Sequence, residues 1–306
     1  MLRGLARTVE RGGLRFVSSE NQYPPLFIVG APRCGTTVVS LHLTNTFEVS
    51  YFPNISKRNP HFPIAAAVFG SLIWDYTPTT ENSYGIVDGP MAPSDGWHIF
   101  HRWFPRYDHS ESVDVDSLPE LRRIVAALEI LMGGPFLNKN NNNSTRIREL
   151  SRLFPQSLFV HVRRNPRDAI ASLIRARKEH DVPPDGWWSV APPQCHDTAP
   201  ADTVKRSVLQ ICKVDDYIRN SLQQIPESRF TEVHYESFCK HPDRIEGWVE
   251  KRYRDYAVEL RTRNCELKGT NYTASTSWDT LSASTQEQIE EMLSLHAECE
   301  AKGGTR

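Results

Sequence analysis

A short stretch near the start of the chain has the residue types of a phosphate-binding loop. It reads LFIVGAPRCGTT over residues 26–37, an apolar run followed by Gly30 and Gly35. These glycines have the separation of the P-loop pattern G-x-x-x-x-G-K-[ST], whose backbone N–H groups cradle phosphates. Thr36 stands where that pattern has its lysine, and the nearest cation is Arg33. The loop is therefore predicted to bind an anion without the lysine that nucleotide hydrolases use.

Several groups of this loop could donate hydrogen bonds to the anion. Gly35 and the residues after it would open a helix, so their amides would point at the ligand, and glycine lets the backbone approach it closely. The side chains add two threonine hydroxyls and a guanidinium, which can form paired hydrogen bonds to phosphate oxygens. We predict that the anion is bound by Arg33, Cys34, Gly35, Thr36 and Thr37.

A second cationic turn follows an apolar run at residues 158–162. The sequence HVRRNPRDAIAS over residues 161–172 places three arginines around a predicted strand-to-helix turn. Arg164 precedes this turn and Ser172 lies near the start of the following helix, so the two side chains could bind one phosphate together. Two such turns imply a ligand with two separated anionic groups.

A metal-dependent kinase or hydrolase of nucleotides is the main alternative for a P-loop protein. Such enzymes hold Mg²⁺ with an aspartate at the end of a second strand. Here the predicted strand at residues 158–162 is followed by Arg163 and Arg164. The six cysteines include no C-x-x-C pair, so neither a metal knuckle nor a redox dithiol is expected. Without the P-loop lysine and a metal-binding aspartate, a nucleotide kinase or hydrolase has little support from the sequence.

The elements that must position these turns follow from the apolar runs and the helical patterns between them. Predicted strands lie at residues 26–29, 47–52, 158–162 and 230–234. Predicted helices include residues 36–44, 167–180 and 203–224, and Ser144 is predicted to cap a helix over residues 147–153. Strands separated by helices indicate an α/β fold, a P-loop-type central parallel sheet flanked by helices on both faces. Ligands of such sheets bind at the carboxyl ends of the strands, where both cationic turns would meet.

Length and composition leave room for one large domain. The chain has 306 residues, of which 39% are hydrophobic. We predict a basic N-terminal tail, which could be flexible, over residues 1–22 and a single α/β domain over residues 23–306. Within this domain, residues 53–115 and 181–200 are rich in proline and tryptophan. We interpret these two segments as excursions from the sheet that wall a pocket, because such segments often carry specificity.

The charge balance limits the kinds of partner. The net charge is −1, so no overall field would recruit nucleic acid or an anionic membrane. No apolar run reaches the length of a membrane span. The scattered cysteines favour free thiols in a reducing compartment, and a cytoplasmic location is predicted. The oligomeric state stays open.

The two anion-binding motifs resemble those of the sulfotransferases that use 3′-phosphoadenosine 5′-phosphosulfate (PAPS). The stretch PRCGTT over residues 32–37 matches the family's 5′-phosphosulfate loop, P-[KR]-[SC]-G-T-T. Arg164, the Asn-Pro pair at 165–166 and Ser172 match its 3′-phosphate motif. The stretch FLNKNNNNSTRIRELSRLFPQSLFVHVRR at residues 136–164 resembles the branch of tyrosylprotein and bacterial sulfotransferases.

The resemblance implies a metal-free transfer of a sulfuryl group from PAPS to a hydroxyl or amine. The acceptor, a small molecule or a carbohydrate, is not identified by the sequence. By the same resemblance, Arg33 would lie beside the 5′-phosphosulfate, while Arg164 and Ser172 would hold the 3′-phosphate. Lys268, in ELKGTNYTAS, resembles a late basic residue that covers the 3′-phosphate in the family. Lys139 would stabilise charge on the oxygen that bridges phosphorus and sulfur.

The residue that takes the acceptor's proton is where this sequence departs from the family. Small-molecule sulfotransferases have a histidine two residues after the corresponding lysine, and here that position is Asn141. The segment APSDGWHIFHRWFP at residues 92–105 offers acid–base groups and resembles a stretch of some bacterial members. We predict Asp95 as the base, with His98 as the second candidate. A non-catalytic nucleotide-binding relative that has lost its base is a further alternative.

Overall fold

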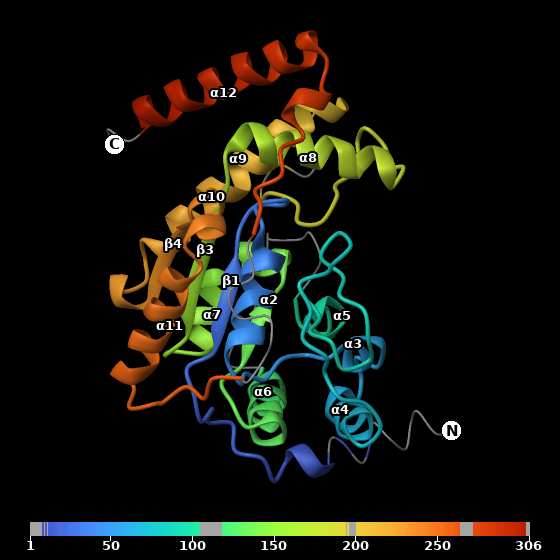
Figure 1. Ribbon diagram of the computed structural model, residues 1–306, viewed down its shortest axis with the longest axis vertical. Helices are drawn as coiled ribbons and strands as arrows, with labels where there is room; N and C mark the ends of the chain where they lie inside the picture. Colours follow the sequence, from blue (N-terminus) through green and yellow to red (C-terminus); the bar gives the residue numbers. More distant parts are fainter. Residues whose placement is uncertain are drawn as a thin grey trace.

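A parallel sheet of four strands forms the centre of the protein in the computed structural model, which describes residues 8, 10, 12–104, 118–193, 195, 200–263 and 272–303 (Figure 1). The strand order is β2-β1-β3-β4, and every neighbouring pair is parallel. The strands are β1 (Leu26–Val29), β2 (Leu137–Lys139), β3 (Leu158–Arg163) and β4 (Phe230–His234). The α/β fold with a parallel sheet is therefore confirmed.

Helices cover both faces of this sheet because its strands are apolar on both sides. In β1, Phe27 and Val29 join one core cluster while Leu26 and Ile28 join the other. The first cluster is covered by α6 (Pro119–Met132), α7 (Ile147–Leu153), α8 (Pro166–Glu179) and α9 (Thr203–Leu222). The second is covered by α2 (Thr36–Thr46), α10 (Tyr235–Lys240) and α11 (Asp243–Asp255). Burial of continuous apolar strands between two helical layers is typical of parallel sheets.

The predicted strands agree with the structure except at one place. Residues 26–29 and 230–234 are strands with the predicted bounds, and the strand at 158 extends to Arg163. The prediction of a strand over residues 47–52 is wrong, because this segment forms only isolated bridges, at Phe47 and Ser50. The strand that the sequence did not predict is the three-residue β2 beside β1, whose sequence Leu-Asn-Lys has no apolar run to indicate a strand.

The helix that follows β2 also begins differently from the prediction. Ser144 does not cap α7, whose N-cap position is Arg146, so that prediction is wrong. Instead, the Ser144 Oγ accepts from the Gly30 amide at 3.0 Å and donates to the Gly30 carbonyl oxygen at 2.9 Å. Residues Asn141–Thr145 form a short 3₁₀ helix, η2, that brings this serine under the phosphate loop. The contact joins the β2 edge to the loop after β1.

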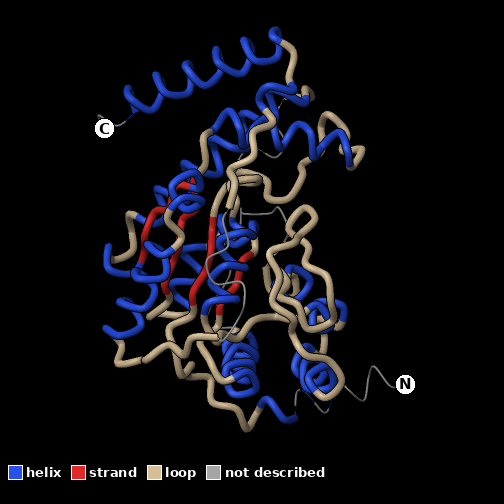
Figure 2. Tube along the Cα trace, viewed as in Figure 1, coloured by secondary structure: helices blue, strands red, loops and turns tan. Residues whose placement is uncertain are grey.

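The remaining helices lie beside the sheet or across one end of the molecule. Figure 2 shows long loops around α3 (Asn54–Arg58), α4 (Pro63–Ser71) and α5 (Trp97–Phe100), beside the sheet. The last helix, α12 (Ala283–Gly303), crosses the opposite end of the molecule and packs on α9 (Figure 1). Short 3₁₀ helices η3 (Glu227–Arg229) and η4 (Trp278–Thr280) precede β4 and α12.

The N-terminal segment contacts α4 through a buried carboxylate. Glu10 Oε2 accepts from the amides of Ile64 and Ala65 at 3.1 and 3.0 Å, in the first turn of that helix. Leu14 is also buried. The division of the chain at residue 22 stays a prediction, but these described residues lie against the domain. Within the described part of the chain, no helix combines the length and apolarity needed to cross a membrane.

Candidate active site

The loop after β1 approaches its neighbours so closely that only glycine fits at two positions. A Cβ at Gly30 would lie 2.6 Å from the Val162 carbonyl oxygen. Gly35 has φ +90° and a Cβ there would lie 2.2 Å from the Tyr235 ring. Gly35 is the N-cap of α2, and the first amides of a helix have no partner inside it. The loop thus presents free amides at the carboxyl edge of the sheet, as the sequence predicts for an anion site.

Cys34 is the one predicted loop residue that turns away from the cavity. Its side chain is 4% exposed and lies in the core, and its amide donates to the Ala31 carbonyl oxygen at 3.3 Å. Burial raises the pKa of its thiol to about 12, so the sulfur carries no charge at neutral pH. Neither the thiol nor the amide of Cys34 is therefore placed to bind a ligand, contrary to the prediction.

Arg33 lies in the left-handed region with φ +66°, and its side chain runs toward α8. Its Nε donates to the Ser172 Oγ at 3.1 Å. The guanidinium lies over the rings of Tyr84 and Trp188, at 4.9 and 5.7 Å from their centroids. Burial lowers the pKa of Arg33, and the positive charges of two nearby arginines lower it further. These surroundings favour a site where an anion would relieve the repulsion.

Arg164, at the end of β3, meets the same loop. Its Nη1 donates to the Arg33 carbonyl oxygen at 3.1 Å, and its Nη2 donates to the Ser275 carbonyl oxygen. The guanidinium lies 5.2 Å from the centroid of the Tyr235 ring, and its buried Nε has no hydrogen-bond partner among the described residues. Ser172 is 3% exposed and lies beneath Arg33. The structure thus brings Arg33, Arg164 and Ser172 together.

Lys139 ends β2 on the other side of the loop. A Cβ added at Gly85 would lie 3.2 Å from the Lys139 Nζ and 3.1 Å from the Thr37 Oγ1, so these two groups face the same space. Burial lowers the pKa of Lys139, the charge of Asp95 raises it, and Lys57 and Arg33 lower it. A desolvated ammonium interacts strongly with any negative charge that develops beside it.

Asp95 and His98 differ in position although they are close in sequence. Asp95 lines the cavity, and its Oδ1 pairs with the Lys57 Nζ at 3.2 Å and accepts from the Trp97 amide at 3.4 Å. His98 is exposed and does not line the cavity, and its ring lies against the Trp97 ring with centroids 3.8 Å apart. The structure therefore brings Asp95, but not His98, to the same cavity as Lys139.

Asn141 connects three segments of the site. Its Oδ1 accepts from the Thr36 Oγ1 at 3.2 Å, and its Nδ2 donates to the Ser189 Oγ at 3.0 Å. The segment with Ser189 is held from behind by buried Gln210, whose Nε2 donates to the Trp188 and Val190 carbonyl oxygens. Asn141 therefore acts as a structural bridge between the phosphate loop and the segment 181–190.

These groups surround one cavity of about 390 Å³ at the carboxyl edge of the sheet. Both of the segments interpreted as excursions supply wall residues, with Tyr84 and Trp97 from one and Trp188 from the other. The cavity is lined by Arg33, Gly35, Thr36, Thr37, Lys57, Asn82, Tyr84, Asp95, Trp97, Lys139, Asn141, Arg164, Trp188, Ser189, Tyr235 and Ser275, among others. Lys268 lies outside the described residues.

The sequence reasoning missed Lys57, Tyr84, Tyr235 and Ser275. For Tyr235 a signal was present, because it directly follows β4 and the carboxyl ends of parallel strands share one edge. Lys57, Tyr84 and Ser275 belong to segments without a regular pattern, so nothing in their spacing indicates that they line the cavity.

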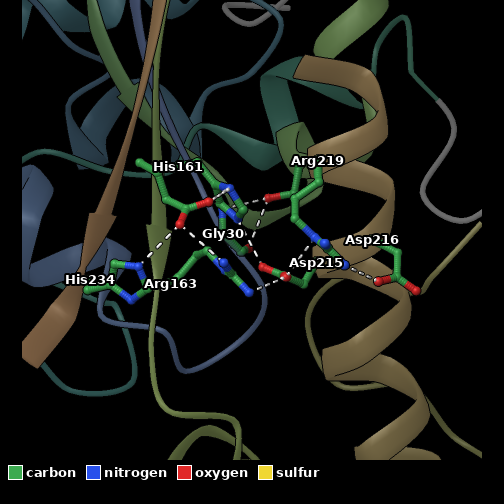
Figure 3. Close-up of polar contacts among 9 residues, drawn as sticks. Gly30, His161, Arg163, Asp215, Asp216, Arg219 and His234 are labelled. Atoms are coloured by element: carbon green, nitrogen blue, oxygen red, sulfur yellow. Dashed lines mark hydrogen bonds and ion pairs between the residues drawn. The ribbon is translucent and has the colours of Figure 1, made fainter. Parts of the chain in front are cut away.

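A second charged cluster lies beside the end of β3 (Figure 3), and its residues His161, Arg163 and Asp215 do not line this cavity. The buried His161 pairs through Nε2 with the Asp215 Oδ1 at 3.1 Å. Arg163 Nη2 lies 3.2 Å from the Asp215 Oδ2, and Arg163 Nη1 lies 3.1 Å from the Glu232 Oε1. Arg219 pairs with both Asp215 and Asp216, at 3.4 and 2.8 Å. Here each of the arginines has a carboxylate partner.

Comparisons with known proteins agree with this architecture. The sequence model of the Sulfotransferase family matches residues 24–247. Sulfotransferase STF9 from Mycobacterium avium has a TM-score of 0.59 at 16% identity, and the match covers 95% of this chain and 81% of that one. Sulfotransferase STF1 from Mycobacterium tuberculosis H37Rv has a TM-score of 0.55 at 14% identity, covering 94% and 80%. At these identities the structural likeness shows the fold, and no curated protein matches the sequence.

Proposed function

Because the chain belongs to the sulfotransferase family, we propose that it transfers a sulfuryl group from PAPS to a hydroxyl or amine of a small molecule or carbohydrate. One observation carries the assignment of the donor. The cationic turns after β1 and β3 meet at a single cavity, with Lys139 on a third strand of the same edge. This arrangement suits a nucleotide with anionic groups at two separate positions.

The chain's own groups fit such a donor. The amides and hydroxyls of residues 35–37 would hold the 5′-phosphosulfate at the start of α2. Arg164 and Ser172 would hold the 3′-phosphate, since the Arg164 guanidinium is bound here only to carbonyl oxygens among the described residues and keeps a buried Nε unpaired. Gly30 and Gly35 let this loop pack closely against the Val162 carbonyl oxygen and the Tyr235 ring, where a Cβ would clash.

In the proposed reaction, the acceptor atom bonds to sulfur while the bond between sulfur and the bridging oxygen breaks, and adenosine 3′,5′-bisphosphate leaves with the electron pair. Lys139 would stabilise the negative charge that grows on the leaving phosphate, an interaction stronger in the transition state than in the ground state. Asp95 would take the acceptor's proton, because it lies on the same cavity. His98, which is exposed outside the cavity, is the weaker candidate.

The acceptor side of the cavity combines aromatic and polar groups. Trp97 and Asn82 line it together with Asp95. Aromatic faces with amide groups beside them suit sugar rings and other polar acceptors with an apolar face.

A donor-binding and transfer experiment tests the proposal. Isothermal titration should show adenosine 3′,5′-bisphosphate binding, and a panel of sugars, phenols and amines incubated with ³⁵S-labelled PAPS should contain a labelled product. Turnover of ATP or GTP that requires magnesium, with no binding of the bisphosphate, would favour the kinase or hydrolase alternative. Binding of the bisphosphate without any transfer would favour a non-catalytic relative.

A further inference from the structure

Residues 272–277, which precede η4, cross the carboxyl edge of the sheet between its two helical layers, and we call them the bridging segment. At one end, the Tyr272 ring contacts α2 and α10, which cover one face of the sheet. At the other end, the Thr276 Oγ1 donates to the Asp168 Oδ1 on α8, which covers the opposite face. Between these ends the chain is exposed. The bridging segment is therefore held at both ends and open to solvent in its middle.

The middle of the bridging segment lies on the wall of the cavity proposed to bind the donor. Ser275 lines this cavity, and its carbonyl oxygen accepts from the Arg164 Nη2. Arg164 is one of the groups proposed to bind the nucleotide. A nucleotide bound at Arg164 therefore lies against the bridging segment.

Tyr272 is held by two aromatic rings and one hydrogen bond. Between ring centroids, it lies 5.1 Å from Phe238 of α10 and 5.6 Å from His42 of α2, which it meets edge-on. Its hydroxyl lies 3.1 Å from the His42 Nδ1. Burial raises the pKa of Tyr272 to about 12, so the hydroxyl keeps its proton at neutral pH. A ring in apolar contact with a paired hydroxyl fixes the residue in one position.

Glu246 on α11 sets the direction of that hydrogen bond. The His42 Nε2 lies 2.8 Å from the Glu246 Oε1. Because a carboxylate only accepts, this nitrogen carries the hydrogen, which leaves Nδ1 as the acceptor for the Tyr272 hydroxyl. Burial lowers the pKa of His42 more than the charge of Glu246 raises it, which favours the neutral ring that this arrangement needs. Tyr272 is therefore bound to α2, the helix that begins at the phosphate loop.

Resting on the proposed function, we propose that Tyr272 is a positioning residue that holds the bridging segment over the bound nucleotide, and that the nucleotide leaves when Tyr272 leaves His42 and Phe238. Tyr272 does not line the cavity itself. It acts through Ser275, three residues further along the chain. Weakening the contacts of Tyr272 should therefore speed the release of the nucleotide.

Surface plasmon resonance with adenosine 3′,5′-bisphosphate measures this release. Tyr272→Phe, which loses only the hydrogen bond, should raise the dissociation rate constant by about fivefold. Tyr272→Ala, which also loses the ring contacts, should raise it by about 10- to 100-fold. His42→Leu should match Tyr272→Phe, because it removes the other partner of the same bond. The double variant His42→Leu/Tyr272→Phe should release the nucleotide no faster than either single variant, since both changes remove one interaction.

The matched controls are Tyr256→Phe and Tyr256→Ala. Tyr256 packs against the same core cluster as Tyr272, but it directly follows α11 and does not line the cavity. These variants should release the nucleotide at the wild-type rate. Thermal unfolding of each variant reports whether it is folded, and if Tyr272→Ala is not, Tyr272→Phe and the double variant decide.

Three results would overturn the role of Tyr272 and leave the donor assignment intact. The first is an unchanged dissociation rate constant in every folded Tyr272 variant. The second is an equal acceleration in the Tyr256 variants. The third is a double variant whose acceleration is the product of the two single effects, since His42 and Tyr272 would then act independently. If the wild-type protein does not bind the bisphosphate at all, the proposed donor fails and the role of Tyr272 fails with it.

Discussion

Arg163 is the last residue of β3 and Arg164 directly follows it, yet the charges around the two side chains are opposite. Arg163 pairs with Asp215 and Glu232 in the cluster of Figure 3, where opposite charges balance. Arg164 faces the cavity and donates only to carbonyl oxygens among the described residues. Successive side chains of a strand point to opposite sides, so one residue step separates the two environments.

The two arginines represent two kinds of charged group. In the cluster of Arg163, opposite charges stabilise the fold, whereas the cations of the cavity are available to bind an anionic ligand. Burial raises the pKa of the Asp215 carboxyl, but the hydrogen bond and charge of His161, with Arg163 and Arg219, outweigh burial and lower the pKa. At the cavity, burial lowers the pKa of Arg33 and Lys139, and the neighbouring cations add to this effect. Uncompensated positive charge in a cavity is therefore the physical mark of the proposed donor site.

The largest expected effect on nucleotide binding comes from replacing Arg164 with alanine, compared with the same replacement of its neighbour Arg163. Arg164→Ala should weaken binding of adenosine 3′,5′-bisphosphate by about 1,000-fold, since two charge-assisted hydrogen bonds are lost. Arg163→Ala should leave that binding nearly unchanged and lower the free energy of unfolding. Titration calorimetry and urea unfolding of both variants provide the measurement. Equal effects of the two substitutions on nucleotide binding would show that Arg164 has no special role in binding the nucleotide.

Lys139→Ala distinguishes two roles of cations in the cavity. Arg164 is proposed to bind the nucleotide, whereas Lys139 is proposed to stabilise the transition state. The rate constant of sulfuryl transfer should fall by about 100-fold, with the affinity for the bisphosphate largely kept. Single-turnover measurements with labelled PAPS and an acceptor found in the panel separate the rate from binding. An unchanged rate constant would show that Lys139 takes no part in the chemistry.

Glu129, away from the cavity, is the opposite case, an acid that has no ion pair with a cation among the described residues. It is 1% exposed, and burial raises its pKa from 4.5 to about 7, although the Gln22 amide among other groups donates to it. A raised pKa means that the folded state binds the proton more tightly. Its contribution to stability is therefore complete below pH 4.5 and is lost as the pH rises through 7.

Glu129→Gln should remove this loss while keeping an acceptor for the Gln22 amide. Between pH 4.5 and pH 8 the wild type should lose on the order of 3 kcal/mol more unfolding free energy than the variant. Urea unfolding of both proteins across this range gives the difference. If the unfolding free energies of the two proteins change in parallel with pH, Glu129 does not titrate between pH 4.5 and pH 8.

Asp215→Asn should produce the smallest effect, on the opposite side of the pH scale. Because the Asp215 side chain is 18% exposed and paired with two arginines and His161, the substitution should cost about 2 kcal/mol at pH 7. Because the pKa of Asp215 is lowered on folding, its stabilisation is present above the ordinary value of 3.8 and is lost as the pH falls through the folded value. The gap between wild type and variant should therefore close in acid, while bisphosphate binding at pH 7 stays intact. A large loss of that binding would connect the cluster to the donor site.

The outcome at particular residues shows how far sequence reasoning reaches. The strand at residues 26–29 and the glycines after it are readable because an apolar run and a tight turn are local features. The strand β2 was missed because a strand of three residues has no period, whereas the apolar segment 47–52 was predicted to be a strand and forms only isolated bridges. The sequence favours Asp95 over His98 as the base, but only the structure shows that Asp95, just before the turn at Gly96, lines the cavity and that His98 does not.

The sequence by itself determined the class of fold, the two cationic turns and the kinship with sulfotransferases, because each depends on residue types at short spacing. The tertiary structure decided which side chains meet. It buried Cys34, turned Arg33 toward Ser172, and made Asn141 a bridge between two loops. These outcomes depend on contacts between residues far apart in the sequence, 139 positions for Arg33 and Ser172 and 48 for Asn141 and Ser189, or on the sign of one backbone angle. Local patterns carry neither kind of information.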